Sequence, residues 1–325
     1  MRLFALTFGP ASTASTYYRL LQYEPLLRQN GVEFSWALAH DFRDFPSLAK
    51  FDLVILQKKI VSPSILRKIR RYSKRLIYDS DDRIWLGHHQ QHSWLTRFRI
   101  SSRMRSIVRQ SDLCLAANQV IASDLQAYGG KVRVVPMSLP SEQWPMRAAS
   151  PGPLTIGWTG SPGSLPYLDP LWPALRRVQR KHPQVRIAIH CGKAPSSQGV
   201  EIIHLPYVMG QESAVVQQFD IGLLPLSSDP FSLGKSPIKA LQYMASGTAI
   251  VGSPVGAFSE MVEPRKSALF ANTELEWENQ IQKLINDPSL RQHLQSEGRW
   301  RFDQSFSQQI VFHLWLRILR EAAGR

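Results

Sequence analysis

Short apolar segments alternate with longer amphipathic ones through the first half of the chain. Apolar runs bounded by turn residues are typical of buried strands, and apolar positions three to four residues apart indicate helices. The pattern predicts strands at residues 2–8, 32–38, 52–57, 75–78, 113–116 and 132–135, and helices at residues 15–30, 63–72, 94–110 and 119–128. Gly31 is expected to end the first helix. Because a strand-then-helix rhythm favours a parallel sheet covered on both faces, we predict one doubly wound α/β domain.

A polar, proline-bearing segment at residues 140–153 interrupts this rhythm and is the predicted linker. A second series follows, with predicted strands at residues 154–158, 185–190, 202–205, 221–225, 249–252 and 268–270, and helices at residues 167–182, 210–219, 237–246 and 275–287. This half is predicted to be a second α/β domain. The last predicted helix carries an apolar stripe that needs a partner surface: Ile310, Val311, Leu314, Trp315, Ile318 and Leu319.

The composition is that of a globular protein, with 325 residues of which 43% are hydrophobic. No run of eighteen apolar residues occurs, and the apolar segment at the N-terminus is too short and too strand-like for a signal peptide, so a cytoplasmic protein is expected.

Cys114 and Cys191 lie in separate apolar segments. They are predicted to be core residues rather than a disulfide or metal ligands.

The net charge of +14 calls for an acidic partner. The excess lies in the first half, where residues 58–75 carry eight basic side chains and residues 97–109 carry five arginines, with no acid in either stretch. Nucleic acid, anionic lipid or a phosphorylated substrate could each neutralise this positive charge. Residues 94–108 fit a basic amphipathic helix on an anionic membrane, although a core-facing helix is favoured. Nucleic acid ranks low, because interleaved aromatic residues and known nucleic-acid modules are absent.

The segment from Gly234 to Ser253 is predicted to be a helix whose start holds an anion. Ser236 suits the N-cap, Pro237 the first helical position, and Gly247 the end. Lys235 and Lys239 stand where the helix dipole disfavours cations unless a negative ligand compensates them. Phosphate is the predicted ligand, held by Ser236, Pro237, Ile238 and the two lysines. A surface helix with two solvated lysines is the alternative.

Other candidate ligand contacts follow the first strand of each predicted domain, because open α/β sheets bind ligands beyond the carboxyl ends of their strands. In the second domain Gly160 and Ser161 offer backbone N–H groups and a hydroxyl to phosphate, unless they form an ordinary turn. The equivalent loop of the first domain comprises Gly9, Ser12, Thr13 and, one helical turn on, Arg19, for which a plain surface position is the alternative.

Three carboxylates within four residues, Asp79, Asp81 and Asp82, repel one another unless a cation or a hydroxyl-rich ligand lies among them. A sugar would satisfy them, and so would pairing with Arg83 and nearby basic helices. His88, His89 and His92 lack a matched ligand spacing and are interpreted as a polar loop, so no metal site is predicted.

These features together resemble the GT-B glycosyltransferases, specifically the retaining group called family 4. In that family the segment runs Glu, seven residues, Glu, then Ala-Met-Ala-x-Gly-x-Pro-Val-Val-x-Ser, and the stretch from Gln242 to Ser253 lies in the same frame. Residues 156–161, 220–225 and 287–291, Trp277 and Phe306-Ser307 extend the resemblance over residues 154–319. In the first half, residues 15–19 and 79–82 are similar to a bacterial subgroup of the same family.

The resemblance implies two Rossmann-like domains facing each other across a cleft, an acceptor-side domain at residues 1–145 and a donor-binding domain at residues 152–305. A final helix at residues 306–325 would cross back to the first domain. The implied reaction moves a sugar from a UDP- or GDP-sugar to a glycan or lipid-linked acceptor with retention, in cell-surface glycan synthesis, with no cofactor and no nucleic-acid partner.

The resemblance also implies residue roles. Lys239 and Lys235 would neutralise the leaving diphosphate without a metal, Asp81 and Asp82 would serve the catalytic centre, and Gln242 would take the ribose contact of the second family glutamate. Gly234 stands where the first glutamate falls. A catalytically silent GT-B-like nucleotide- or sugar-binding protein is therefore the alternative function.

Overall fold

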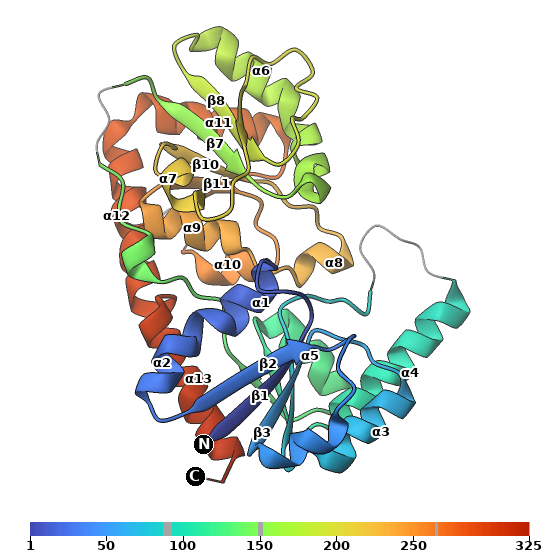
Figure 1. Cartoon of the computed structure of the whole chain (residues 1–325). Helices are drawn as coiled ribbons and strands as arrows, with labels where there is room; N and C mark the ends of the chain where they lie inside the picture. Colours follow the sequence, from blue (N-terminus) through green and yellow to red (C-terminus); the bar gives the residue numbers. More distant parts are fainter. Residues whose placement is uncertain (87–92, 149–151, 264–265, 325) are drawn as a thin grey trace. The chain divides into compact units, whose positions relative to one another are not determined.

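The computed structural model describes residues 1–86, 93–148, 152–263 and 266–324, in two compact units (Figure 1). Unit 1 contains Met1–Ser138, Leu233–Ser236 and Gln308–Arg325, and unit 2 contains Leu139–Ser232 and Pro237–Ser307. His88, His89 and His92 lie outside the described residues.

Unit 1 is built on a six-stranded parallel sheet in the order β2-β1-β3-β4-β5-β6. Its strands are β1 (Arg2–Thr7), β2 (Glu33–Leu38), β3 (Leu53–Gln57), β4 (Leu76–Ser80), β5 (Leu113–Ala116) and β6 (Val132–Val134). Its helices are α1 (Ala14–Arg19), η1 (Leu21–Tyr23), α2 (Glu24–Gln29), η2 (Phe45–Lys50), α3 (Pro63–Tyr72), α4 (Trp94–Gln110), α5 (Gln119–Ala127) and α13 (Gln308–Ala322). Figure 1 shows α2 and α13 on one side of this sheet and α3 and α4 on the other. The sheet changes winding direction between β1 and β3, which is where such folds place ligands.

Unit 2 repeats the plan with the strand order β12-β11-β10-β7-β8-β9. Its strands are β7 (Thr155–Thr159), β8 (Arg186–Cys191), β9 (Ile203–Pro206), β10 (Ile221–Leu224), β11 (Ala249–Gly252) and β12 (Leu269–Phe270). Its helices are η3 (Ser141–Gln143), η4 (Pro162–Leu171), α6 (Trp172–Lys181), α7 (Glu212–Val216), α8 (Pro230–Leu233), α9 (Ile238–Ser246), α10 (Ala257–Met261), α11 (Glu274–Asn286) and α12 (Pro288–Ser305). The winding changes direction between β7 and β10. Both cysteines are buried in the cores, as predicted.

The single helix predicted at residues 15–30 is wrong. The chain forms α1, then η1 and α2, with a break at Leu20, whose φ of −132° and ψ of −61° are not helical. Pro25 explains the break, because a proline inside a continuous helix has no N–H and its ring clashes with the carbonyl of residue 21. Gly31 follows α2 with a φ of 69°, so its predicted role as the stop is confirmed.

A similar break corrects the helix predicted at residues 167–182. Pro166 and Pro170 keep residues 162–171 in η4, and the α-helix begins only at Trp172. The short helices α8 and α10 have no counterpart among the predicted elements, because neither is long enough to show a helical period.

Helix α13 packs against the core of unit 1 through Val311, Phe312, Trp315, Leu316, Ile318 and Leu319. The Trp315 ring stacks on Tyr23, with ring centroids 5.1 Å apart. Ile310, predicted to belong to the apolar stripe, is 47% exposed. Among the described residues, no helix is long and apolar enough to span a bilayer.

We predict that Trp315→Ala destabilises unit 1 by about 3–5 kcal/mol, because a fully packed aromatic side chain leaves a cavity. A denaturant titration combined with hydrogen exchange of the β1 amides measures the change. Trp300, which is 57% exposed on α12, supplies the matched control, and Trp300→Ala should change the free energy of unfolding by less than about 0.5 kcal/mol. Equal effects of the two substitutions would contradict the packing role of Trp315.

Candidate functional site

A buried ion pair lies at the carboxyl edge of the first sheet. Arg19, at the end of α1, is 4% exposed, and its guanidinium binds both carboxylate oxygens of Asp79 at the end of β4. Its Nη1 also donates to the carbonyl oxygen of Val135 at 2.5 Å. The prediction that Arg19 reaches an anionic ligand is therefore corrected. Its donors are used inside unit 1, because a buried guanidinium needs partners for its charge.

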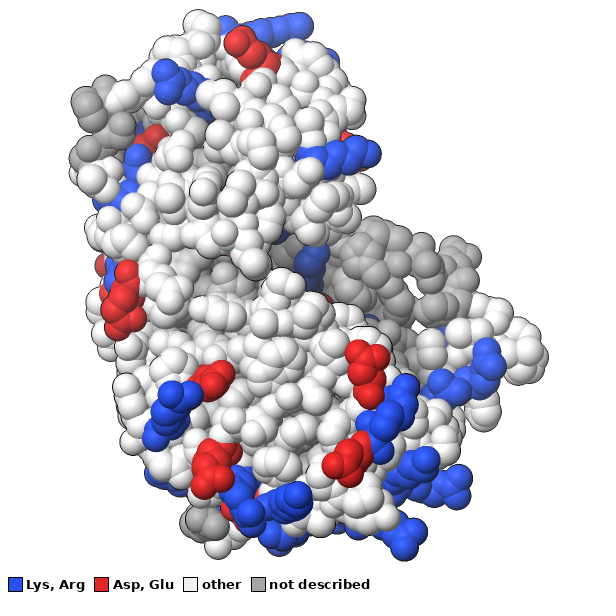
Figure 2. Space-filling model, in the orientation of Figure 1, with Lys and Arg blue, Asp and Glu red and all other residues white. Residues whose placement is uncertain are grey.

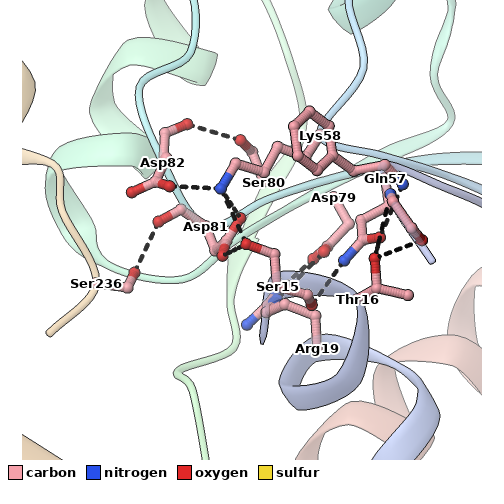
Figure 3. Close-up of polar contacts among 12 residues, drawn as sticks. Ser15, Thr16, Arg19, Gln57, Lys58, Asp79, Ser80, Asp81, Asp82 and Ser236 are labelled. Atoms are coloured by element: carbon pink, nitrogen blue, oxygen red, sulfur yellow. Dashed lines mark hydrogen bonds and ion pairs between the residues drawn. The ribbon is translucent and has the colours of Figure 1, made fainter. Parts of the chain in front are cut away.

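Lys58 forms a second charged cluster one residue beyond β3 (Figure 3). Its Nζ lies 3.1 Å from Asp81 Oδ1, donates to Ser15 Oγ at 2.9 Å and pairs with Asp82. Ser15 Oγ in turn donates to Asp81 Oδ2 at 2.6 Å. Lys58 adopts a left-handed backbone with a φ of 46°, which a non-glycine residue keeps only where surrounding contacts hold it.

The electrostatics of this cluster follow from burial and charge. Burial lowers the pKa of Lys58, but the adjacent Asp81 and Asp82 outweigh burial and raise it. Burial raises the pKa of Asp81, yet the charge of Lys58 and the Ser15 hydrogen bond bring it below its ordinary value. Burial and then repulsion by Asp81 raise the pKa of Asp82, whose side chain is 24% exposed. Asp82 is thus the more accessible carboxylate of this pair.

The predicted pairing of the aspartates with Arg83 is wrong, because Arg83 binds Asp124 instead. Arg83 Nε and Nη2 donate to the two carboxylate oxygens of Asp124 at 2.7 and 2.9 Å. The indole Nε1 of Trp85 donates to the same carboxylate at 2.9 Å. These contacts fix the position of the Arg83 side chain.

The segment Leu233–Ser236 belongs to unit 1 by its contacts. The Asn118 Nδ2 donates to the carbonyl oxygen of Gly234 at 3.0 Å and to Ser236 Oγ at 3.3 Å. Ser236 Oγ itself donates to the carbonyl oxygen of Asp81 at 2.9 Å (Figure 3). The predicted N-cap is therefore wrong. Helix α9 begins at Ile238 and is preceded by Pro237 with a φ of −82° and a ψ of 73°, without a side-chain cap.

Gly234 has a steric reason to be glycine. A Cβ at this position would lie 2.2 Å from both Cγ and Cδ of Arg83, whose far end is held by Asp124. A glutamate, the residue that the family resemblance places here, would displace Arg83. The same neighbourhood also contains Lys235, whose charge lowers the pKa of Asp82 in opposition to burial.

The loop after β1 is closed by its own hydrogen bonds. The N–H of Gly9 donates to Thr16 Oγ1 at 3.3 Å, and Thr16 Oγ1 donates to the Gly9 carbonyl at 3.0 Å. A Cβ at Gly9 would lie 2.3 Å from Thr13 Oγ1, so Thr13 fills the space of a side chain. Ser12 is exposed. The backbone N–H of Gly9, predicted as a phosphate contact, is thus already used.

In unit 2 the corresponding edge brings Lys239 against Gly160. Lys239, in the first turn of α9, places Nζ 4.2 Å from the centroid of the Trp158 ring in β7, a cation–π contact. A Cβ at Gly160 would lie 2.6 Å from Lys239 Nζ and 2.4 Å from Trp158 Cη2. The glycine therefore allows an ammonium group to lie beside the turn that follows β7.

His190 and Tyr243 hold the backbone of this turn. The N–H of Gly160 donates to the His190 carbonyl at 3.0 Å, and Thr159 Oγ1 lies 3.0 Å from His190 Nδ1. Burial lowers the pKa of His190, so its imidazole is neutral near pH 7. The N–H of Thr159 donates to the Tyr243 hydroxyl at 3.2 Å. These hydrogen bonds hold the backbone of residues 159 and 160 against His190 and Tyr243.

The remaining predicted contacts lie near the same edge. Ser161 precedes η4, with its Oγ 3.2 Å from Ser164 Oγ. Gln242 is 7% exposed on α9. Gly247 ends α9 with a φ of 65°, as predicted. No group of three or more metal-ligating side chains occurs within the described part of the chain.

Sequence reasoning missed Lys58, Trp158, His190 and Asn118 as parts of these edges. Lys58 was counted only in the basic stretch, yet its place directly after a buried strand was a usable signal. Nothing local marks Asn118 or His190, since their partners are more than thirty residues away in sequence.

Residues 155–287 match the family model described as glycosyl transferases group 1. The whole chain is similar in fold to sucrose-phosphate synthase from Thermosynechococcus elongatus, with 13% identity, a TM-score of 0.75 and 98% of each chain covered. HepE from Anabaena, solved in complex with UDP-glucose, has 15% identity and a TM-score of 0.69, over 98% of this chain and 99% of HepE. No curated protein sequence matches significantly. The predicted fold of two Rossmann-like α/β domains is confirmed.

We predict that Lys58→Met lowers the free energy of unfolding by about 3–5 kcal/mol at neutral pH, because the buried Asp81 and the partly exposed Asp82 lose their partner. The low pKa of Asp81 in the folded protein contributes stability above pH 3.8, its ordinary value, which is lost as pH falls through the folded pKa. The difference between wild type and variant should therefore shrink below pH 3.8. Denaturant titrations across this range measure it.

Lys59→Met is the matched control, since Lys59 is half-buried and neighbours the same strand end. It should leave stability near the wild-type value. A Lys58→Met difference that stayed constant with pH would contradict the pairing with Asp81 and Asp82.

Proposed function

We propose that the chain is a GT-B glycosyltransferase that takes its sugar from a UDP- or GDP-sugar and transfers it to a glycan or lipid-linked acceptor. The match of residues 155–287 to the group 1 family model supports this. We further propose retention of the anomeric configuration and no requirement for a metal ion. The proposed setting is cell-surface glycan synthesis in the cytoplasm, at the inner face of a membrane.

The contact of Lys239 with Trp158 and Gly160 carries this proposal. It holds a cation beside the backbone turn that follows β7, next to the point where the sheet of unit 2 changes winding direction. Phosphate groups bind where backbone N–H groups and a fixed cation converge. HepE, which shares the fold, was solved with UDP-glucose, and this supports a nucleotide sugar as the donor.

The chemistry needs stabilisation of the leaving group. When the bond between the sugar and the diphosphate breaks, negative charge develops on the diphosphate oxygen, and fixed cations lower the free energy of that transition state. We assign this role to Lys239, whose ammonium is already oriented by Trp158. Lys235 is the second cation in this proposal, four residues earlier in the chain. Ser236, Pro237 and Ile238 would line the diphosphate, and Gln242 would contact the ribose.

On the acceptor side we assign the contact to Asp82. It is the more exposed carboxylate of the Lys58 cluster, so it can accept a hydrogen bond from an acceptor hydroxyl. Asp81 is 5% exposed, and Ser15 and Lys58 occupy its oxygens. Its role in this proposal is to position Lys58 and Asp82.

A catalytically silent binding protein is the second candidate. The observation that favours it is the space at Gly234, where Arg83 lies in place of an acidic side chain. Binding of the donor without turnover would be the outcome for such a protein.

We predict that Lys239→Met reduces kcat for donor turnover by about 10²-fold or more, because the leaving diphosphate loses a fixed cation. Release of UDP or GDP from a panel of nucleotide sugars, with and without glycan acceptors, measures the rate. Lys283→Met, on the exposed side of α11, is the control and should keep wild-type activity. Turnover that survives treatment with a chelator would support metal independence.

The outcomes of that assay separate the candidates. Wild-type rates for Lys239→Met would remove this lysine from the mechanism. Tight nucleotide binding with intact donor after long incubation would favour the silent binding protein, and neither binding nor turnover would overturn the proposed function.

We also predict that Gly160→Ala raises the Kd for nucleoside diphosphate and lowers turnover by about tenfold to a hundredfold, because the new methyl group displaces Lys239 Nζ. Calorimetric titration with UDP and GDP measures the affinity. Gly163→Ala is the matched control, since a Cβ there meets nothing within 4 Å. Equal affinity of both variants would show that the spacing at Gly160 does not matter.

A further inference from the structure

The first half of helix α4 leaves large apolar side chains in solvent. Trp94 is 76% exposed, Phe98 70% and Leu95 55%. Phe98 is three residues from Leu95 and four from Trp94, so the three side chains share one side of the helix. The second half behaves differently, because Met104, Ile107 and Val108 are fully buried in unit 1. The second half of α4 is thus anchored in the core, while the first half leaves its apolar side uncovered. The core-facing helix favoured from the sequence is therefore correct only for the second half.

Arginines surround the exposed apolar side chains. At 100° per residue, Arg105 continues the line of Trp94 and Phe98 along the helix, and Arg97 and Arg99 lie on the two flanks of the apolar side. Among the described residues, no hydrogen bond or ion pair involves the side chain of Arg97, Arg99, Arg103 or Arg105. The helix itself contains no acidic residue. Its charge is therefore available to an external partner.

The adjacent helix α3 extends the basic surface. Arg67 and Lys68 are exposed there, and Figure 2 shows lysine and arginine side chains gathered at its lower right, over α3 and α4. Other cations of this region are partly neutralised, since Arg70 and Arg75 pair with Asp112. Arg97, Arg99 and Arg105 of α4 form no such ion pair among the described residues, and they lie within one or two helical turns of the exposed apolar side chains.

We propose that the exposed half of α4 docks the protein on an anionic lipid bilayer. Trp94, Leu95 and Phe98 would enter the interface between headgroups and acyl chains, while the arginines bind lipid phosphates. Exposed Trp and Phe with Arg on a solvent-facing helix match the composition of interfacial helices, and basic residues near a bilayer are attracted by its negative surface potential. Nucleic acid would satisfy the arginines but not the aliphatic Leu95, so lipid fits the whole surface better. The inference depends on no step of the sugar transfer.

Flotation with vesicles tests this proposal. The full chain should float with vesicles of phosphatidylcholine and phosphatidylglycerol, and weakly with phosphatidylcholine alone. The double variant Arg97→Gln/Arg99→Gln should bind anionic vesicles about tenfold more weakly or worse. The double variant Trp94→Ser/Phe98→Ser should lose a similar share of binding, and its effect should persist at high salt, because burial of apolar area is not screened.

Matched controls lie in unit 2. Arg180→Gln/Lys283→Gln removes the same charge from exposed positions, and Trp300→Ser/Leu275→Ser removes a comparable exposed apolar area. Both controls should bind as wild type does. Equal loss in controls and α4 variants, equal binding to neutral and anionic vesicles, or no binding at all would each overturn the proposal.

Two further readouts identify a different occupant. Salt-sensitive RNA binding that the arginine variants abolish, without vesicle binding, would replace lipid with nucleic acid. A dimer in sedimentation that the Trp94→Ser/Phe98→Ser variant dissociates would replace lipid with a second copy of the chain. Turnover of a nucleotide sugar without vesicles should be unchanged in the α4 variants, so failure of docking and failure of the proposed function are distinguishable.

Discussion

Charge burial at the carboxyl edge of the first sheet constrains every residue placed there. Arg19 with Asp79, and Lys58 with Asp81, leave water almost completely, and buried charges are tolerated only when their partners are held in place. The partners come from the end of α1, the end of β3 and the end of β4, so the pairing ties three segments together. The left-handed backbone of Lys58 is a local cost that this pairing offsets.

The second constraint is steric and falls on two glycines. At Gly160 and at Gly234 the space of a side chain is filled by a cation from elsewhere in the same unit, Lys239 in one case and Arg83 in the other. The consequences differ. Lys239 lies beside the turn that we propose as a phosphate site, while Arg83 is bound to Asp124 and fills the space of the glutamate that the family resemblance places at position 234. Gly160 thus fits the proposed donor site, and Gly234 is where the sequence departs from the family pattern that it resembles.

Helix α4 shows how one element can serve two purposes. Its buried end belongs to the core of unit 1, and its exposed end combines aromatic and cationic side chains that folding does not use. The apolar residues of the two halves of α4 lie on different sides of the helix. A pattern of apolar positions taken over the whole helix therefore does not show that one half is buried and the other exposed.

Much of the fold could be predicted from the sequence, since buried strands and amphipathic helices have periods that a single chain displays. Strands β5 and β11 and helices α3 and α4 have the predicted bounds. The errors are concentrated at prolines, as in residues 15–30, where one missing N–H divides a helical pattern. The candidate site was less predictable. Local context predicted Lys239, Gly160 and Asp82 as site residues, and these stay predictions. Arg19 was given a ligand role, but its buried guanidinium pairs with Asp79, and Ser236 was predicted as an N-cap but donates to the carbonyl oxygen of Asp81.

The sequence by itself determined two parallel α/β domains, the loops that follow their strands and a basic first half, because these depend on local periodicity and on composition. Only the tertiary structure decided which charged side chains pair with a carboxylate inside the protein. Arg19, Lys58 and Arg83 differ from Arg97, Arg99 and Arg105 of α4 in the carboxylates that folding brings to them. Those carboxylates lie tens of residues away, so burial and pairing, which set the available charge, are properties of the folded chain.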